Sequence, residues 1–381
     1  MSFMRRTRIG RAVLAAAVVG MAAASCGVAH SGLGNAQAGG NPANQASARA
    51  SATWPARLVL AEPVRLGIVS QVIDSRAKTD FALTSSGHGS FKLRRSSLAG
   101  GKVTTGPSFR VRSVALASGS LWVFGARPAG PTAERMRLYR VSARTLRVER
   151  TMTLGPSRGA SGLAALAPGT HGTIWVSFGR TVLHLAARTG ATIGTIRLPS
   201  GLLPGDIALS PSGRLLYVET SHRTGGGFSP VLEYGTASLR KLAMNTKSVT
   251  AVNVGGGMLT AAPGGVWVSF RTGMLGQTVL LRQQDLRSVK LPGAGSRHSL
   301  FTWAMGATTA YAAPSLYLVQ SVSAVAGCVR PSTGHIRARG HVAGHLEADE
   351  LLGSAQHGRV LYAAAAHGVF AIRPPAGCRA G

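Results

Sequence analysis

The feature that most constrains this chain is a short apolar segment, centred on an aromatic residue, that recurs along its length. Three copies carry tryptophan between aliphatic neighbours: Leu121-Trp122-Val123, Ile174-Trp175-Val176 and Val266-Trp267-Val268. The central aromatics in chain order are Phe81, Trp122, Trp175, Tyr217, Trp267, Tyr311 and Tyr362. The steps between them are 41, 53, 42, 50, 44 and 51 residues, and strand repeats of about 40–50 residues are typical of propellers. We therefore predict an all-β chain that folds as a seven-bladed β-propeller.

The residues between the aromatics fit the other parts of a blade. The predicted blades are 64–108, 109–156, 157–200, 201–253, 254–293, 294–343 and 344–378. The last of them reaches Pro374-Pro375 before it has a fourth strand, and proline cannot donate a hydrogen bond to a sheet. We expect residues 57–60 to supply this missing outer strand, which would close the ring without leaving an open sheet edge.

The first 25 residues predict export. Arg5, Arg6, Arg8 and Arg11 precede the apolar stretch from Ala12 to Ala24, a pattern typical of a signal peptide and short for a membrane span. Ala23-Ala24-Ser25-Cys26 resembles a bacterial lipobox, which predicts lipidation of Cys26. The alternative is an ordinary secretory peptide cleaved nearby, in which Cys26 has no role.

Residues 26–53 are predicted to form a disordered tether. Residues 27–53 are rich in alanine, serine, glycine, asparagine and glutamine, and contain no acid and only one arginine, Arg49. Such a segment spans on the order of 30 Å, enough to hold a folded head away from a membrane; the alternative is a leader with no spacing role. The predicted domains are thus a signal peptide at 1–25, a tether at 26–53 and a propeller at 54–381. The predicted location is extracytoplasmic, either membrane-anchored or secreted.

The turns of the repeat carry a resemblance to known proteins. Arg188-Thr189-Gly190 and Pro331-Ser332-Thr333-Gly334 follow the aromatic strands of their blades. With the preceding aromatic strands, these turns resemble the bacterial propellers of the YVTN-repeat, quinoprotein-like and streptogramin-lyase-like group over residues 57–378. The resemblance implies the fold and does not select among the functions of that group.

Two cysteines remain beyond the lipobox. Cys328 and Cys378 lie in the last two predicted blades, and in an exported protein such a pair favours a disulfide. The alternative is two free buried thiols.

The charge of the chain is strongly positive. Its formal net charge is +30, from 42 lysines and arginines against 12 acids. The second blade concentrates arginine along Glu134-Arg135-Met136-Arg137-Leu138-Tyr139-Arg140 and at Arg144, Arg147 and Arg150. This rim suits an anionic envelope polymer or lipid surface, although a solvated outer strand has the same composition. Because export separates the chain from nucleic acid and no aromatic stacking pattern accompanies the arginines, we expect no nucleic-acid partner.

Catalytic motifs are absent from the sequence. It contains no nucleophile elbow, HExxH pair, Walker loop or CxxC pair, and we expect no cofactor. His345, Glu347 and Asp349 alternate at the period of a strand and could hold a divalent cation, although a solvated strand entry explains them as well. His298 and Glu347 are the nearest pair to the histidine and glutamate that the resemblance to streptogramin lyases implies.

These observations favour a non-enzymatic, exported and lipid-anchored binding or scaffolding module of the cell envelope, acting as a monomer with an envelope protein or polymer as partner. The alternative is a metal-dependent lyase or hydrolase with its site at the channel mouth. The predicted ligand-binding residues at that mouth are Arg112, Asp206, His298, His345 and Glu347.

Overall fold

The aromatic segments of the sequence lie in antiparallel sheets in a computed structural model of the chain. The structure describes residues 52–378, except for 62–67, 75, 87–88, 101, 127–134, 157–164, 223–229, 246–257, 273–274, 293–298, 305–306, 321–323, 344–350, 358–359 and 366–367. All described residues belong to one compact unit, residues 49–381. The predicted signal peptide, Cys26 and nearly all of the predicted tether lie outside the described residues.

The first four blades follow one another along the chain. A single strand, β6, is the outer strand of blade 1 through Phe109 and the inner strand of blade 2 from Arg110. The strands are β3 (Ile68–Asp74), β4 (Thr79–Ser85), β5 (Phe91–Ser97) and β6 (Thr104–Ala117); β7 (Ser120–Ala126), β8 (Arg135–Ser142) and β9 (Val148–Pro156); β10 (Leu166–Pro168), β11 (Thr173–Phe178), β12 (Thr181–Ala186) and β13 (Thr192–Arg197); β14 (Leu202–Leu209), β15 (Leu215–His222), β16 (Val231–Gly235) and β17 (Lys241–Met244).

The last three blades complete the set of seven. Blade 5 also receives a short strand, β22, along β20. The strands are β18 (Met258–Ala262), β19 (Gly265–Thr272), β20 (Leu275–Arg282), β21 (Ser288–Val289) and β22 (Thr302–Ala304); β23 (Ala307–Ala312), β24 (Ser315–Gln320), β25 (Val325–Val329) and β26 (Ile336–Val342); β27 (Leu351–His357), β28 (Val360–Ala365) and β29 (Gly368–Ile372). A short 3₁₀ helix, η3 (Ala376–Cys378), ends the described chain.

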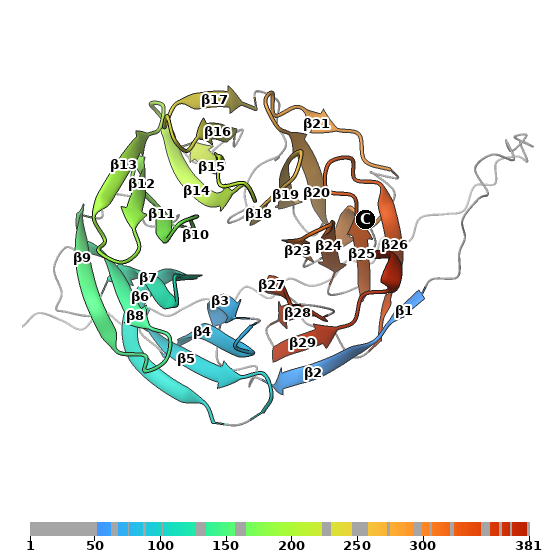
Figure 1. The fold of residues 1–381 in the computed structure, drawn as a ribbon, viewed down its shortest axis with the longest axis horizontal. Helices are drawn as coiled ribbons and strands as arrows, with labels where there is room; N and C mark the ends of the chain where they lie inside the picture. Colours follow the sequence, from blue (N-terminus) through green and yellow to red (C-terminus); the bar gives the residue numbers. More distant parts are fainter. Residues whose placement is uncertain are drawn as a thin grey trace, which may run out of the picture. The chain divides into compact units, whose positions relative to one another are not determined.

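The innermost strands form a closed circuit. They contact one another in the order β3, β6, β10, β14, β18, β23, β27 and back to β3, and Figure 1 shows the blades radiating from this centre. Each pair of neighbouring blades buries an apolar core between its facing sheets. The prediction of a seven-bladed, all-β propeller is confirmed.

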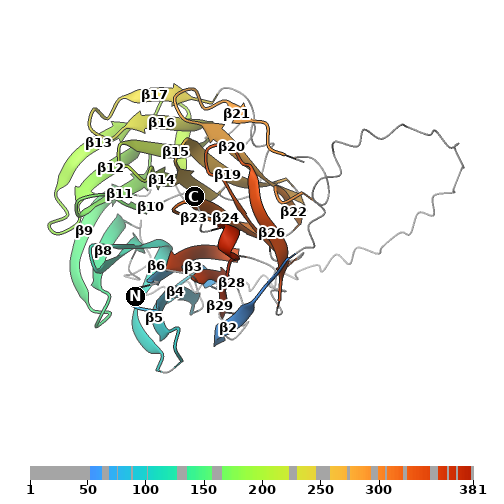
Figure 2. The same cartoon turned by 45° about the vertical axis from the view of Figure 1, so that its right-hand side comes forward.

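Two strands from the N-terminal side close the ring. β2 (Ala56–Ala61) pairs antiparallel with β29 and completes blade 7, which confirms the prediction for residues 57–60 (Figures 1 and 2). Gly368 permits this pairing, because a Cβ at that position would overlap the carbonyl oxygen of Leu60. A second strand, β1 (Ala52–Trp54), pairs in parallel with β26 of blade 6. It includes two residues that the prediction had placed in the tether.

Trp54 ties this N-terminal segment into the interior. Its side chain is 0% exposed and packs in the core between blades 6 and 7. The same core contains the disulfide between Cys328 and Cys378, whose Cα atoms are 5.7 Å apart. The predicted disulfide is therefore present. The Ser315 hydroxyl also donates a 2.6 Å hydrogen bond to the Cys378 carbonyl oxygen, so the C-terminal segment is held against blade 6.

The turn between the third and fourth strands has the same conformation in five blades. The fourth residue of the turn has a positive φ, and its backbone N–H donates a hydrogen bond to the carbonyl oxygen four residues earlier. This hydrogen bond defines an α-turn. The residues at this fourth position are Leu146, Gly190, Leu239, Leu286 and Gly334. A positive φ is strained for leucine, and the burial of the leucine side chains against the preceding blade offsets that strain.

The turn residue and the outer strand of the preceding blade are complementary in size. Leu239 packs against Gly194, where an added Cβ would lie 2.5 Å from the leucine side chain. The reverse arrangement occurs at Gly190, where a Cβ would overlap the sulfur of Met152. Both of these junctions therefore place one large side chain opposite a glycine.

The assignment of Tyr311 to an aromatic second strand was wrong. Tyr311 lies on β23, the innermost strand of blade 6. The second strand is β24, and its central aromatic is Tyr317, which is 1% exposed. The number of blades does not change, because Tyr317 belongs to the same repeat.

Candidate functional site

The centre of the propeller contains a cavity of about 420 Å³. The innermost strands β10, β14, β18 and β23 of four consecutive blades supply its walls. The lining is almost entirely aliphatic, with Thr260, Thr309 and Tyr311 as its polar side chains. The side chains that leave space at the centre are Ala167, Ala208, Ala261 and Ala310. The described lining holds no carboxylate, imidazole or amine.

Asp206 lies on β14 beside this cavity and connects two blades. Its Oδ2 accepts a hydrogen bond of 2.7 Å from the Leu259 amide on β18, and its Oδ1 accepts one of 2.9 Å from the Ile207 amide. Burial of the carboxyl raises the pKa of Asp206 to about 6, and the two amide hydrogen bonds partly oppose this rise. Both oxygens are therefore engaged, and Oδ2 links blade 4 to blade 5.

Other polar side chains also link neighbouring blades near the centre. The hydroxyl oxygens of Thr260 on β18 and Thr309 on β23 are 2.6 Å apart. The Ser177 hydroxyl on β11 donates to the Gly205 carbonyl on β14 at 3.2 Å. These hydrogen bonds hold neighbouring blades in register, and Thr260 and Thr309 also line the cavity.

The remaining predicted site residues are only partly placed. Arg112 lies on β6, and its side chain is not among those described. His298, His345 and Glu347 lie outside the described residues, as does Asp349. Their predicted ligand-binding role remains a prediction. Within the described ranges, no group of three histidine, cysteine, aspartate or glutamate side chains could hold a metal ion.

The surface carries a large excess of positive charge. The described residues include 29 lysines and arginines against 7 acids. Three of these acids are buried, namely Asp80, Glu219 and Glu233, and Asp206 is engaged with backbone amides. The other three are engaged in local contacts. Asp74 accepts hydrogen bonds from the backbone amides of the turn after β3, and Glu149 pairs with Arg140 at 3.2 Å.

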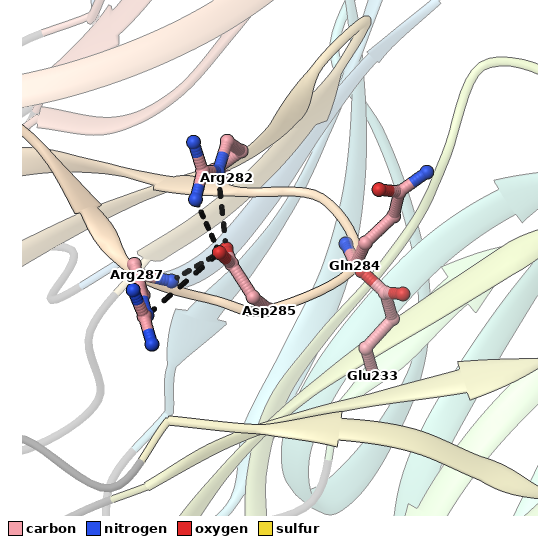
Figure 3. A network of polar contacts seen from close by, with 5 residues as sticks. All are labelled: Glu233, Arg282, Gln284, Asp285 and Arg287. Atoms are coloured by element: carbon pink, nitrogen blue, oxygen red, sulfur yellow. Dashed lines mark hydrogen bonds and ion pairs between the residues drawn. The ribbon is translucent and has the colours of Figure 1, made fainter.

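The third of these acids, Asp285, lies in the β20–β21 turn (Figure 3). Arg282 pairs with its carboxylate, and the Arg287 amide donates to it at 3.1 Å. The hydrogen bond from Arg282 holds the pKa of Asp285 at about 2, with the Arg287 amide contributing. In the same view the backbone N–H of the neighbouring Gln284 donates a 3.3 Å hydrogen bond to the Glu233 carboxylate of blade 4. Asp285 is thus fully ionised and already paired with arginine.

The predicted arginine rim of blade 2 is divided between structural and exposed side chains. Arg140 donates to the Ser120 hydroxyl and to the Arg188 carbonyl of blade 3 at 2.8 Å, so it joins two blades. Arg144, Arg147 and Arg150 are exposed on the β8–β9 hairpin and have no acidic partner among the described residues. These three side chains form what we call the blade 2 rim.

A second cavity, of about 520 Å³, lies between blade 7 and blade 1, where the ring closes. We call it the seam cavity. The closing strand β2 and strands β28 and β29 line one side, and the β3–β4 turn and the end of β5 line the other. Its residues are Pro55, Ala56, Arg57, Val59, Lys78, Leu98, Ala99, Val360, Tyr362, Ala371 and Arg373.

Within the part of the chain that the structure describes, no helix is long and apolar enough to cross a membrane.

Comparison with known proteins identifies the fold and no family. No family model matches the chain, and no curated protein matches it either. BamB from Moraxella catarrhalis is similar in structure, with a TM-score of 0.50, 15% identity, and coverage of 80% of this chain and 82% of that one. The Pan2 WD40 domain of Neurospora crassa has a TM-score of 0.54 and 10% identity, covering 85% and 95%. A chain of the mitotic checkpoint complex has a TM-score of 0.56 and 13% identity, covering 90% and 98%. At these identities the likeness establishes the propeller fold alone.

Proposed function

We propose that this propeller is an exported, non-enzymatic binding module of the cell envelope that recognises an anionic partner. In this proposal the predicted tether, residues 26–53, and a lipid on Cys26 hold the propeller at the membrane surface. The disulfide between Cys328 and Cys378 supports an oxidising compartment outside the cytoplasm.

The observation that carries the proposal is the distribution of charge. In the described part of the chain, every acid outside the interior is already engaged with arginine or with backbone amides. The arginines of the blade 2 rim have no such partner and project from the outer hairpin of their blade. The part of the surface that the structure describes therefore has unpaired positive charge available for an anionic partner, and little negative charge to repel one.

The central cavity supports binding over catalysis. Its described lining is aliphatic apart from two threonines and Tyr311, so it offers no described group able to exchange a proton near neutral pH. Asp206 lies beside the cavity, but both of its carboxylate oxygens already accept hydrogen bonds from backbone amides. Calorimetric titration of the full chain with Mg²⁺, Ca²⁺ and Zn²⁺ tests this assignment. Metal binding accompanied by metal-dependent turnover would favour the lyase or hydrolase alternative.

Binding to a soluble polyglycerolphosphate polymer tests the partner class. We would use the full chain with Cys26→Ser, so that a lipid cannot contribute to binding. The blade 2 rim variant R144Q/R147Q/R150Q should bind roughly tenfold more weakly, since each exposed cation pair contributes about 0.2–1 kcal/mol. The control R57Q/K78Q/R373Q removes the same charge at the seam cavity and should bind within about twofold of the parent, allowing for its lower net charge. Equal losses in the two variants would show that net charge alone drives binding and would contradict a specific rim.

The anchor has a separate test. Cells fed a labelled fatty acid should incorporate it into the wild-type chain and not into Cys26→Ser, and the variant should move from the membrane fraction to the soluble one. An unlabelled, soluble wild-type chain would favour secretion instead.

A further inference from the structure

Among the described residues, the junction between blade 7 and blade 1 has the smallest apolar core of the seven. It contains three buried apolar side chains, Leu98, Tyr362 and Val369. The described residues of the other junctions bury between nine and twelve. The described side chains leave a gap here, in contrast to the close packing that is normal in protein interiors.

The seam cavity occupies this gap. Val59, Leu98, Val360, Tyr362 and Ala371 give it an apolar wall, and three of them, Val59, Val360 and Ala371, are only partly buried. At the other junctions the space beside the outer strand is filled by a side chain such as Leu239 or Met152. Its volume of about 520 Å³ lies within the range of about 300–1,000 Å³ that small-molecule sites occupy.

Positive charge surrounds the opening of this cavity. Arg57, Lys78 and Arg373 all contribute to its lining, and none of the described lining residues is an acid. All three residues are exposed, and none forms an ion pair or a side-chain hydrogen bond with another described residue. They come from three separate elements: β2, the β3–β4 turn and the residue after β29. The fold therefore brings three free cations together beside an apolar space.

We propose that the seam cavity binds a single-chain amphipathic anion of the fatty-acid type. The acyl chain would lie against Val59, Leu98 and Tyr362, and the carboxylate would lie among Arg57, Lys78 and Arg373. This chemistry satisfies both halves of the site at once, because the chain covers the exposed apolar wall and the head group pairs with the unpartnered cations. The site is distinct from the blade 2 rim, so the two proposals can fail separately.

Calorimetric titration of the full chain carrying Cys26→Ser tests the proposal. The probe is laurate, used below its micelle concentration, with dodecanol and acetate as matched ligands that lack the charge and the chain. We expect one laurate per chain, with dodecanol and acetate binding at least about tenfold more weakly. The variant R57Q/K78Q/R373Q should weaken laurate binding about tenfold, whereas R144Q/R147Q/R150Q should leave it unchanged.

The position of the acyl chain is tested by filling the cavity. Ala371→Phe should abolish laurate binding without removing a cation, and Ala99→Trp, at an exposed turn position of the lining, serves the same purpose if Ala371→Phe does not fold. Acetate binding as tightly as laurate would show a simple anion site. Laurate binding that survives the cation and cavity variants would place the ligand elsewhere, and either result would overturn the proposal.

Discussion

Replacing Asp206 with asparagine should destabilise the propeller at acid pH, and this cost should shrink as the pH rises to neutral. The folded chain raises the pKa of Asp206 to about 6, from an ordinary value of 3.8, because its carboxyl is buried. A rise of about two units corresponds to about 3 kcal/mol. Since the residue keeps some exposed surface, this figure is an upper value.

The sign of the effect follows from proton binding. A carboxyl whose pKa is higher in the folded state binds its proton more tightly there, so its contribution to stability is complete below about pH 4 and is lost as the pH rises to about 6. Asparagine does not titrate, and its NH2 cannot accept one of the two backbone hydrogen bonds, so it costs stability by an amount that does not depend on pH. The free energy of unfolding of Asp206→Asn relative to wild type should therefore rise by up to about 3 kcal/mol between pH 4 and pH 7.

Urea unfolding from pH 4 to 7.5, followed by tryptophan fluorescence, measures this difference. Other titrating groups affect both proteins equally and cancel. Asp206→Ala is the structural control. It also removes the pH dependence, but it leaves both the Leu259 and the Ile207 amides without an acceptor. It should therefore be less stable than Asp206→Asn at every pH. A stability of Asp206→Asn relative to wild type that is constant with pH, or that falls as the pH rises, would refute the reasoning.

Three further substitutions test the packing and the closure of the ring. Replacing Cys328 and Cys378 with serine opens a loop closed over a separation of 50 residues and should cost about 4 kcal/mol; an unchanged urea midpoint would contradict this. Trp54→Ala should cost about 3–5 kcal/mol, because the indole is fully buried between blades 6 and 7, and a loss below about 1 kcal/mol would show that β1 is dispensable. Gly190→Ala should destabilise through its positive φ and its overlap with Met152, and in a double-mutant cycle its cost should fall when Met152 is alanine. Strict additivity would exclude that contact.

The sequence predicted those parts of the fold in which the same short aromatic motif recurs in successive blades. Trp122, Trp175 and Trp267 lie on second strands, as their spacing indicated, and each is at most 1% exposed. Tyr311 misled the assignment because it stands among alanines, six residues before the true central aromatic, Tyr317. Two short strands that lie so close together give no separate periodic signal.

Features that depend on contacts between distant segments were harder to predict. β1 has three residues and lies at the end of an alanine- and serine-rich leader, so neither composition nor alternation marks it. Only the isolated tryptophan, Trp54, could have suggested a buried anchor. The left-handed turn was visible at Gly190 and Gly334 but not at Leu146, because a buried leucine looks the same in sequence whatever its φ.

The candidate sites were the least predictable part. Asp206 was found from its place near the start of an innermost strand, but its bond to the Leu259 amide depends on how two blades meet. The seam cavity could not be found at all, since Arg57, Lys78 and Arg373 are separated in sequence and come together only when β2 closes the ring. In a chain with 42 lysines and arginines, a single cation does not indicate a binding site.

The salt dependence of binding tests the central claim, recognition of an anionic envelope partner, most directly. The affinity of the full chain with Cys26→Ser for polyglycerolphosphate would be measured by calorimetry over a series from low to high sodium chloride. If paired charges provide the binding, the affinity should be highest at low salt and should fall steadily as the salt concentration rises, because screening weakens exposed charge pairs. Affinity that does not change with salt, or the absence of binding at the lowest salt concentration, would contradict the account.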